Sequence, residues 1–176
     1  MSTWKIDPSH SEVQFKIKHL MISTVTGEFT EYDSTLVSGN SEDDFNGGQV
    51  NFSAKIASIN TKNEQRDQHL KAGDFFDAEK YPELLFESTS LDLSGGEIVL
   101  KGNLTLKETT KPVTLKGDFG GVMVDFYGQT KAGFEVEGKI NRQDFGLTWS
   151  AVTEAGGVVV SDDVRLLLNV QYVKQA

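Results

Sequence analysis

Apolar and polar residues alternate along most of this chain. From Glu12 to His19, the apolar Val13, Phe15 and Ile17 are separated by polar or charged residues, so one face of the segment is apolar and the other is polar. A period of two is typical of a β-strand with one face buried. The same alternation recurs in later segments, at residues 50–56, 98–106, 113–119, 132–140 and 164–172.

Two further segments, 25–37 and 85–93, bring the predicted set to about eight strands, a number that closes naturally into a barrel. Gly27 and Phe29 occupy odd positions, whereas Tyr32 and Leu36 occupy even ones, so the two pairs would face opposite sides of a regular strand. We therefore expect a β-bulge between Phe29 and Tyr32 that restores the register. Short connections with turn residues favour antiparallel pairing of neighbouring strands. The fold class predicted from the pattern is therefore all-β, an eight-stranded antiparallel barrel.

One segment has a different pattern and predicts a short helical insert around residues 62–81. Thr61-Lys62-Asn63-Glu64 matches a capping box, with Thr61 at the helix start, and Gly73 can end the helix after about Ala72. Asp77 can cap a further short turn that must end before Pro82. The insert could lie across a barrel mouth. Since no repeat or linker interrupts the chain, residues 1–176 are expected to form a single domain.

The net charge of −9 disfavours polyanionic partners. The 26 acidic residues outnumber the 17 basic ones, and no Lys/Arg run breaks the pattern, so we expect neither nucleic-acid binding nor attraction to an anionic membrane. No segment has the apolar length of a signal peptide or a membrane span, which predicts a cytoplasmic protein without stable membrane insertion, or a periplasmic one if a leader was removed. The absence of cysteine excludes disulfides and thiol chemistry.

The predicted inner face combines large and very small residues. Phe15, Phe52, Phe119 and Phe134 lie on the apolar parity of their strands, and so do three glycines, Gly102, Gly117 and Gly138. Side chains could fill such a barrel, or glycines could leave room for one small ligand; the glycines could equally relieve curvature at barrel corners. Because the residues predicted to face the barrel interior include almost no charged side chains, a bound ligand must be mostly hydrocarbon, such as a polyprenyl or acyl chain.

Several short motifs follow one another over nearly the whole chain: Trp4-Lys5-Ile6-Asp7-Pro8-Ser9-His10-Ser11, His19, Val25-Thr26-Gly27-Glu28-Phe29, Asn60-Thr61-Lys62-Asn63, Arg66-Asp67-Gln68-His69-Leu70, Phe75-Phe76-Asp77, Tyr81-Pro82, Gly102-Asn103-Leu104-Thr105-Leu106, Pro112-Val113-Thr114-Leu115 and Arg142-Gln143-Asp144-Phe145-Gly146. In this order they resemble the YceI family of lipocalin-like, polyisoprenoid-binding proteins. The resemblance implies an elongated antiparallel barrel that holds an isoprenoid or related lipid in its lumen. Some relatives are periplasmic and carry a leader, whereas this sequence resembles the leaderless kind.

The inward parity and the family motifs together predict the residues that contact the lipid: Phe15, Ile17, His19, Val25, Phe29, Phe52, Leu70, Phe76, Phe86, Leu104, Phe134, Val136 and Phe145. Phe145, like Trp149 nearby, could flank the entrance or simply fill the barrel end.

Three further polar residues are candidate contacts for a lipid head group: Arg66, His69 and Arg142. Arg66 and His69 lie three residues apart on the predicted helix and so share a face. Arginine offers forked donors that can bind a phosphate or quinone oxygen. The alternative, which we favour, is that Arg66 or Arg142 pairs with Asp67 or Asp144 and pins the helix to the barrel.

We expect neither a metal site nor a catalytic cofactor. His10, His19 and His69 are separated by nine and fifty residues, which matches no compact ligand motif. No Ser-His-Asp or nucleophile-elbow pattern is visible either. The leading hypothesis is a lipid carrier or sequestering protein for a polyprenyl chain or prenyl quinone, and not an enzyme. The alternatives are an enzyme that acts on such a lipid and an interaction module with a filled barrel. The protein could also form a homodimer.

Overall fold

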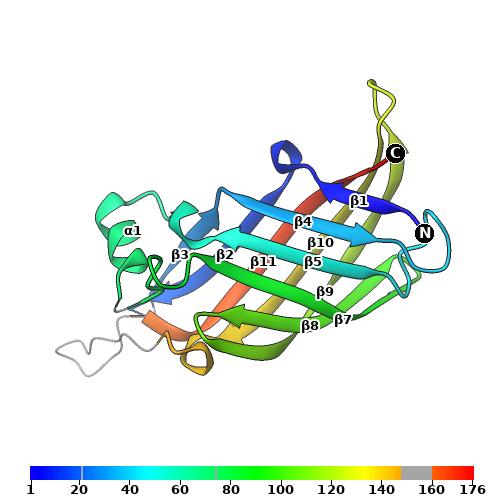
Figure 1. The fold of residues 1–176 in the computed structure, drawn as a ribbon. Helices are drawn as coiled ribbons and strands as arrows, with labels where there is room; N and C mark the ends of the chain where they lie inside the picture. The colour runs from blue at the N-terminus through cyan, green and yellow to red at the C-terminus, as the bar shows by residue number, and fades with distance from the viewer. Residues whose placement is uncertain (21, 74, 148–159) are drawn as a thin grey trace.

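The computed structural model describes residues 1–20, 22–73, 75–147 and 160–176, and it shows a closed antiparallel barrel (Figure 1). Each strand position in the barrel is called a wall here, and two of the walls are each formed by two consecutive strands separated by a break. The strands are β1 (Thr3–Ile6), β2 (Glu12–His19), β3 (Ser23–Phe29), β4 (Tyr32–Val37), β5 (Gln49–Lys55), β7 (Glu83–Ser94), β8 (Glu97–Leu106), β9 (Thr109–Val124), β10 (Thr130–Asn141) and β11 (Val160–Lys174). With β1/β2 and β3/β4 each taken as one wall, the barrel has the predicted eight strands, and β11 closes it by pairing with both β1 and β2.

The two interruptions have different local causes. A 3-10 turn, η1 (Pro8–His10), separates β1 from β2, and the Asp7 side chain caps it by accepting a hydrogen bond from the Ser9 amide. Between β3 and β4, the inward parity changes from Phe29 to Tyr32, as the sequence predicts. The change takes the form of a break in the strand rather than the expected bulge within one strand, because β3 pairs with β2 while β4 pairs with β1 and β5.

The connection between β5 and β7 contains the predicted helical insert. It consists of η2 (Ile56–Ser58), the two-residue strand β6 (Ile59–Asn60) and α1 (Glu64–Lys71). The predicted cap at Thr61 is wrong: Asn63 caps α1 by accepting a hydrogen bond from the Arg66 amide at 3.0 Å. Lys62 adopts a left-handed conformation (φ 64°), so the chain turns after Thr61 and the helix begins two residues later than the capping box suggests.

Both termini lie at the end of the barrel opposite α1 (Figure 1), and a cluster of aromatic side chains fills the barrel at this end. The connection between β4 and β5 folds inward and buries Phe45 completely against Trp4, with the two rings edge to face at 5.1 Å. Phe45 also contacts Phe119 and Phe134. We call these four residues the aromatic plug.

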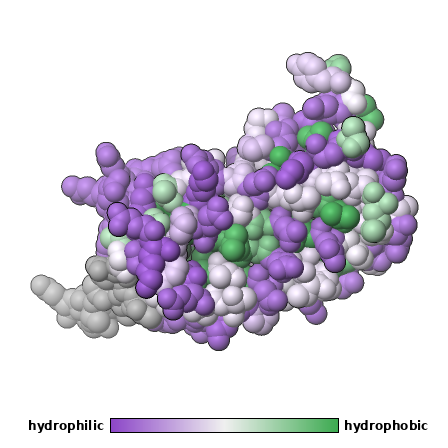
Figure 2. Space-filling model, in the orientation of Figure 1, coloured by the Kyte–Doolittle hydropathy of each residue, from purple (hydrophilic) through white to green (hydrophobic). Residues whose placement is uncertain are grey.

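The β9–β10 hairpin extends beyond the barrel at the same end (Figure 1). The β8–β9 pairing stops at Asp118, whereas β9 continues to Val124. Its tip exposes four large apolar residues: Met123, Val124, Phe126 and Tyr127. By contrast, hydrophilic residues cover most of the face that Figure 2 shows.

The inward glycines do not create free space, contrary to one of the two expectations. A Cβ on Gly102 would lie 2.5 Å from the Phe86 ring, and one on Gly138 would lie 2.6 Å from Leu115. At Gly117 the Cβ would lie 1.8 Å from the backbone oxygen of Glu135. These positions allow neighbouring strands and side chains to approach closely, which favours the alternative that glycine serves barrel curvature.

No helix in the described ranges is long and apolar enough to cross a lipid bilayer.

Candidate functional site

A cavity of about 370 Å³ lies inside the barrel. Its lining comes from every wall of the barrel and from the α1 connection. Several inward side chains, such as Ile17, Phe52 and Leu166, are only half-buried although they point away from the outer surface, since they face this hollow. The interior is therefore hollow, which argues against the filled-barrel hypothesis.

Most of the side chains predicted to contact a lipid come together on the cavity wall. They are Phe15, Ile17, His19, Val25, Phe29, Phe52, Leu70, Phe76, Phe86, Leu104, Phe134 and Val136. Phe145 is not among the lining residues: it lies in the 3-10 helix η3 (Arg142–Phe145) and is buried in the core. Trp149 lies outside the described residues.

Sequence reasoning missed part of the wall. Leu100, Leu115 and Leu168 line the cavity and could have been found from the inward parity of their strands. Phe75 and Leu147 also line it, but each lies in an irregular connection where alternation carries no information.

The deep end of the cavity is uncharged. Phe134 of the aromatic plug and Tyr172 lie there, and their rings meet edge to face at 5.9 Å. The Tyr172 hydroxyl forms a 2.8 Å hydrogen bond with Ser34 Oγ. Burial raises the pKa of Tyr172 to about 12, although the Ser34 hydrogen bond opposes the rise. The phenol therefore stays protonated, and its hydroxyl already has a hydrogen-bond partner in Ser34.

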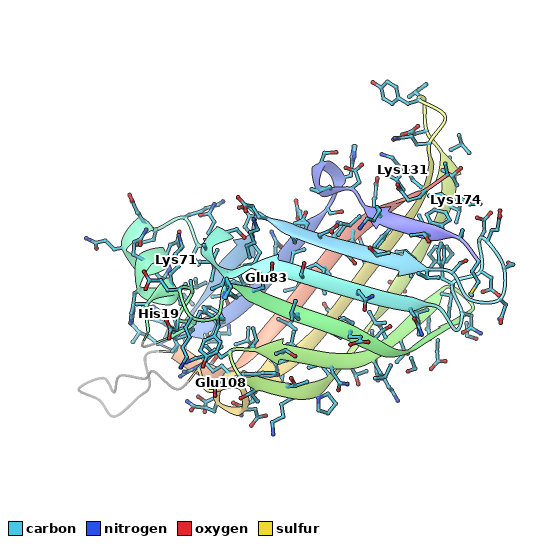
Figure 3. All side chains as sticks on the ribbon, viewed as in Figure 1. His19, Lys71, Glu83, Glu108, Lys131 and Lys174 are labelled. Atoms are coloured by element: carbon cyan, nitrogen blue, oxygen red, sulfur yellow. The ribbon has the colours of Figure 1, made fainter. Side chains whose placement is uncertain are left out.

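Polar side chains gather instead at the α1 end. His19, Arg66 and His69 line the cavity there and are half-buried, so they meet both the hollow and the solvent. In Figure 3 His19 and Lys71 lie at this end, and Lys131 and Lys174 lie at the opposite end. Because the aromatic plug fills the opposite end and these three side chains are half-buried, we infer that the α1 end is the mouth of the cavity.

Arg66 is held mainly by its own connection. Its Nε donates to Thr61 Oγ1 at 2.7 Å and its Nη2 donates to the Thr61 carbonyl at 2.6 Å. The Thr61 amide and hydroxyl in turn donate to the Asp67 carboxylate. Arg66 therefore connects to Asp67 through Thr61 and not by the direct pair considered above, and this network fixes the start of α1 at the mouth.

Arg142 also has a structural role at the mouth. Its side chain is 1% exposed, its Nε donates to the Ser161 carbonyl at 2.9 Å and its Nη1 donates to the Leu147 carbonyl at 2.6 Å. Burial lowers the pKa of Arg142, while the Asp162 carboxylate, 3.5 Å away, raises it. Among the described residues, Arg142 forms an ion pair with Asp162, and the structure shows none with the expected Asp144. Arg142 ties the end of η3 to the start of β11.

A second polar cluster lies on the outside of the barrel. Asp7 accepts hydrogen bonds from the Ser9 hydroxyl and Lys131, and its carboxylate lies 2.9 Å from His10 Nδ1. The Ser9 hydroxyl contacts the same His10 nitrogen, so the histidine does not bridge the two groups as a catalytic triad requires. Within the described ranges, no three His, Asp or Glu side chains lie close enough to hold a metal ion.

Comparison with known proteins identifies clear relatives. A family model described as the YceI-like domain matches residues 4–172. Proteins described as "Protein YceI" from Salmonella newport (strain SL254) and Salmonella arizonae are each 37% identical over 174 residues, which cover 98% of this chain and 87% of theirs.

Solved structures show the same barrel. A Campylobacter jejuni YCEI protein is 34% identical with a TM-score of 0.76, over 92% of this chain and 91% of that one. BcnA from Burkholderia cenocepacia (19% identical, TM-score 0.79, 94% of this chain and 98% of that one) shares the fold. So does a polyisoprenoid binding domain from Saccharophagus degradans (14% identical, TM-score 0.71, 99% and 100%).

Proposed function

Because this chain belongs to the YceI-like domain family, we propose that it binds one isoprenoid-type lipid, a polyprenyl chain or a prenyl quinone, and carries or sequesters it. The observation that carries the proposal is the apolar cavity, which ends near the aromatic plug and is lined at its other end by half-buried side chains beside α1. The isoprenoid class is supported by the Saccharophagus degradans neighbour, which is described as a polyisoprenoid binding domain.

The distribution of polar groups predicts the orientation of the lipid. The walls between mouth and plug are almost entirely hydrocarbon and aromatic, and each CH₂ group buried there contributes about 0.8 kcal/mol. His19, Arg66 and His69 lie only at the mouth. A lipid with a polar head therefore enters tail first, with its head near these three side chains.

The residues that line the cavity support lipid binding rather than catalysis. Acid–base catalysis needs a titratable pair within hydrogen-bond reach of the reacting atom. Among the described lining residues, the ionisable groups are His19, Arg66, His69, Arg142 and Tyr172, with no carboxylate among them. Arg66 and Arg142 already bond to backbone carbonyls, and this arrangement supports a binding protein.

Mass spectrometry of the purified protein tests the proposal directly. Organic extraction should release an isoprenoid lipid, and the delipidated protein should take up a prenyl quinone from detergent. Leu168→Trp places a larger side chain in the hollow and should lower quinone binding at least tenfold. Asn169→Trp is the matched control, since Asn169 lies next to it on β11 but is exposed on the outer face. Absence of both extracted lipid and quinone uptake would overturn the proposal.

A further inference from the structure

The turn between β2 and β3 exposes two large apolar side chains beside the mouth. Ile22 is 82% exposed and Leu20 is 38% exposed. His19 immediately precedes them and Val25 follows, and both line the cavity. The Ile22 amide donates to the His19 carbonyl at 3.1 Å, which holds the turn against the end of β2. We call Leu20 and Ile22 the portal pair.

Leu20 is an unfavourable residue for its backbone conformation. Its φ of 52° lies in the left-handed region, where glycine or asparagine fits with less strain than a bulky residue. Leu20 is also outside the buried core, so core packing does not explain a leucine there. A residue that breaks a local rule without a packing gain is expected at a functional surface.

The barrel wall beside the portal pair is completed by the α1 connection rather than by a full strand. Strand β3 pairs with β2 along its whole length, but on its other edge β6 pairs only with Glu28 and Phe29. Leu70 and Phe76, from the α1 connection, line the cavity at this place. The mouth is thus bordered by the portal pair on one side and by α1 on the other.

We propose that the portal pair docks the mouth on the surface of a neutral, zwitterionic lipid bilayer, from which the lipid passes into the cavity. This inference rests on the proposed function. A tail that moves directly from bilayer to cavity never exposes its apolar surface to water, whereas free diffusion would expose all of it. Insertion of Ile22 and Leu20 between lipid head groups adds apolar burial, as in proteins that lie at the membrane interface.

The net charge of the protein favours a neutral bilayer over an anionic one. The net charge of −9 repels an anionic surface. The charges near the mouth are mixed: Lys18, Lys62 and Lys71 lie there together with Glu64, Asp67 and Asp162. Apolar contact therefore provides the docking, and anionic lipid should weaken it.

The exposed tip of the β9–β10 hairpin provides a matched control. Phe126 is fully exposed there, but the tip lies at the plugged end of the barrel, away from the mouth. A bilayer that contacted the hairpin would not face the cavity opening. Serine in place of Ile22 or Phe126 removes a similar apolar surface at opposite ends of the molecule.

Two measurements on the full chain test the inference. The first is flotation of the delipidated protein with phosphatidylcholine vesicles. The second is the rate at which the protein takes up a prenyl quinone from such vesicles. Ile22→Ser and Leu20→Asn should each reduce flotation and slow uptake about tenfold, while quinone binding from detergent and the unfolding temperature stay at the wild-type level or above. Phe126→Ser should behave as wild type in every measurement.

The results separate this inference from the proposed function. Wild-type uptake and flotation by Ile22→Ser, or an equal loss in Phe126→Ser, overturns bilayer docking by the portal pair while leaving lipid binding intact. Faster uptake from vesicles with 30% phosphatidylglycerol overturns the choice of a neutral bilayer. If the wild type binds no quinone even from detergent, the proposed function fails, and flotation alone still decides whether the portal pair contacts a bilayer.

Discussion

At the scale of single residues, the side chains at the mouth show that residue type does not determine role. Arg66 and Arg142 both offer the forked donors that suit a lipid head group. The structure instead directs three of their hydrogen bonds to carbonyl oxygens of the protein itself, at Thr61, Leu147 and Ser161. Their main contribution is therefore to the shape of the mouth.

Replacement of Arg142 by methionine should lower the free energy of unfolding by about 2–4 kcal/mol, because two carbonyl groups lose charged donors in a buried setting. Urea denaturation measures the change. Arg165→Met is the control: Arg165 is 56% exposed and lies 3.6 Å from Glu137, so its loss should cost less than about 1 kcal/mol. Equal effects of the two substitutions would contradict the structural role of Arg142.

The outer cluster around Asp7 predicts a pH dependence of stability. Burial opposes ionisation of Asp7, but hydrogen bonds from Ser9, His10 and Lys131 outweigh it and hold its pKa well below the ordinary 3.8. The folded state thus binds its proton more weakly than the unfolded state. The resulting stabilisation is present above pH 3.8 and is lost as the pH falls through the folded-state pKa.

Asp7→Asn should therefore destabilise the protein at pH 7, by about 1.5–3 kcal/mol, the range for hydrogen bonds to a charged group. The difference in the free energy of unfolding between the variant and the wild type should become smaller below pH 3.8. Urea denaturation at a series of pH values measures this difference. A difference that stays constant down to pH 2 would show that it does not arise from the charge of Asp7.

At the scale of elements, the strands were predictable because alternation is a local pattern. Strand β2 follows the alternation of residues 12–19 closely. Strand β1 was missed because its four residues are too few to show a period, and its pairing with both β4 and β11 is long-range. The start of α1 was misplaced for a different reason: Thr61 bonds to Asp67 and Arg66 instead of to a free helix amide.

Strand pairing also decides what the inward glycines do. Gly117→Ala should destabilise the protein by about 3 kcal/mol, because its Cβ would meet the Glu135 backbone oxygen, which cannot move without shifting β10. Gly133→Ala on the facing strand is the control: nothing lies within 4 Å of its Cβ, and the cost should be below about 1 kcal/mol. Thermal unfolding of both variants makes the comparison. A tolerated alanine at Gly117 would argue against close strand approach there.

At the scale of the whole molecule, the hollow barrel predicts that lipid binding stabilises the fold. A quinone at 100 times its dissociation constant adds about 2.7 kcal/mol, which should raise the unfolding temperature of the delipidated protein by about 5–10 °C. Scanning calorimetry with and without quinone measures the shift. Asn169→Trp should keep the shift and Leu168→Trp should lose it; a shift retained in Leu168→Trp would place the ligand outside the cavity.

The sequence by itself determined the all-β class, the eight walls, the helical insert and an apolar inner face, because each follows from residues close together in the chain. Only the tertiary structure decided that the interior is hollow, that the aromatic plug closes one end, and that α1 and the portal pair border the other. Those properties depend on how Phe45, Trp4 and Phe134 meet across the barrel and on which strand edges stay without partners. Contacts between residues far apart in the chain produce no local sequence pattern. The position of the mouth can therefore be found only from the folded barrel.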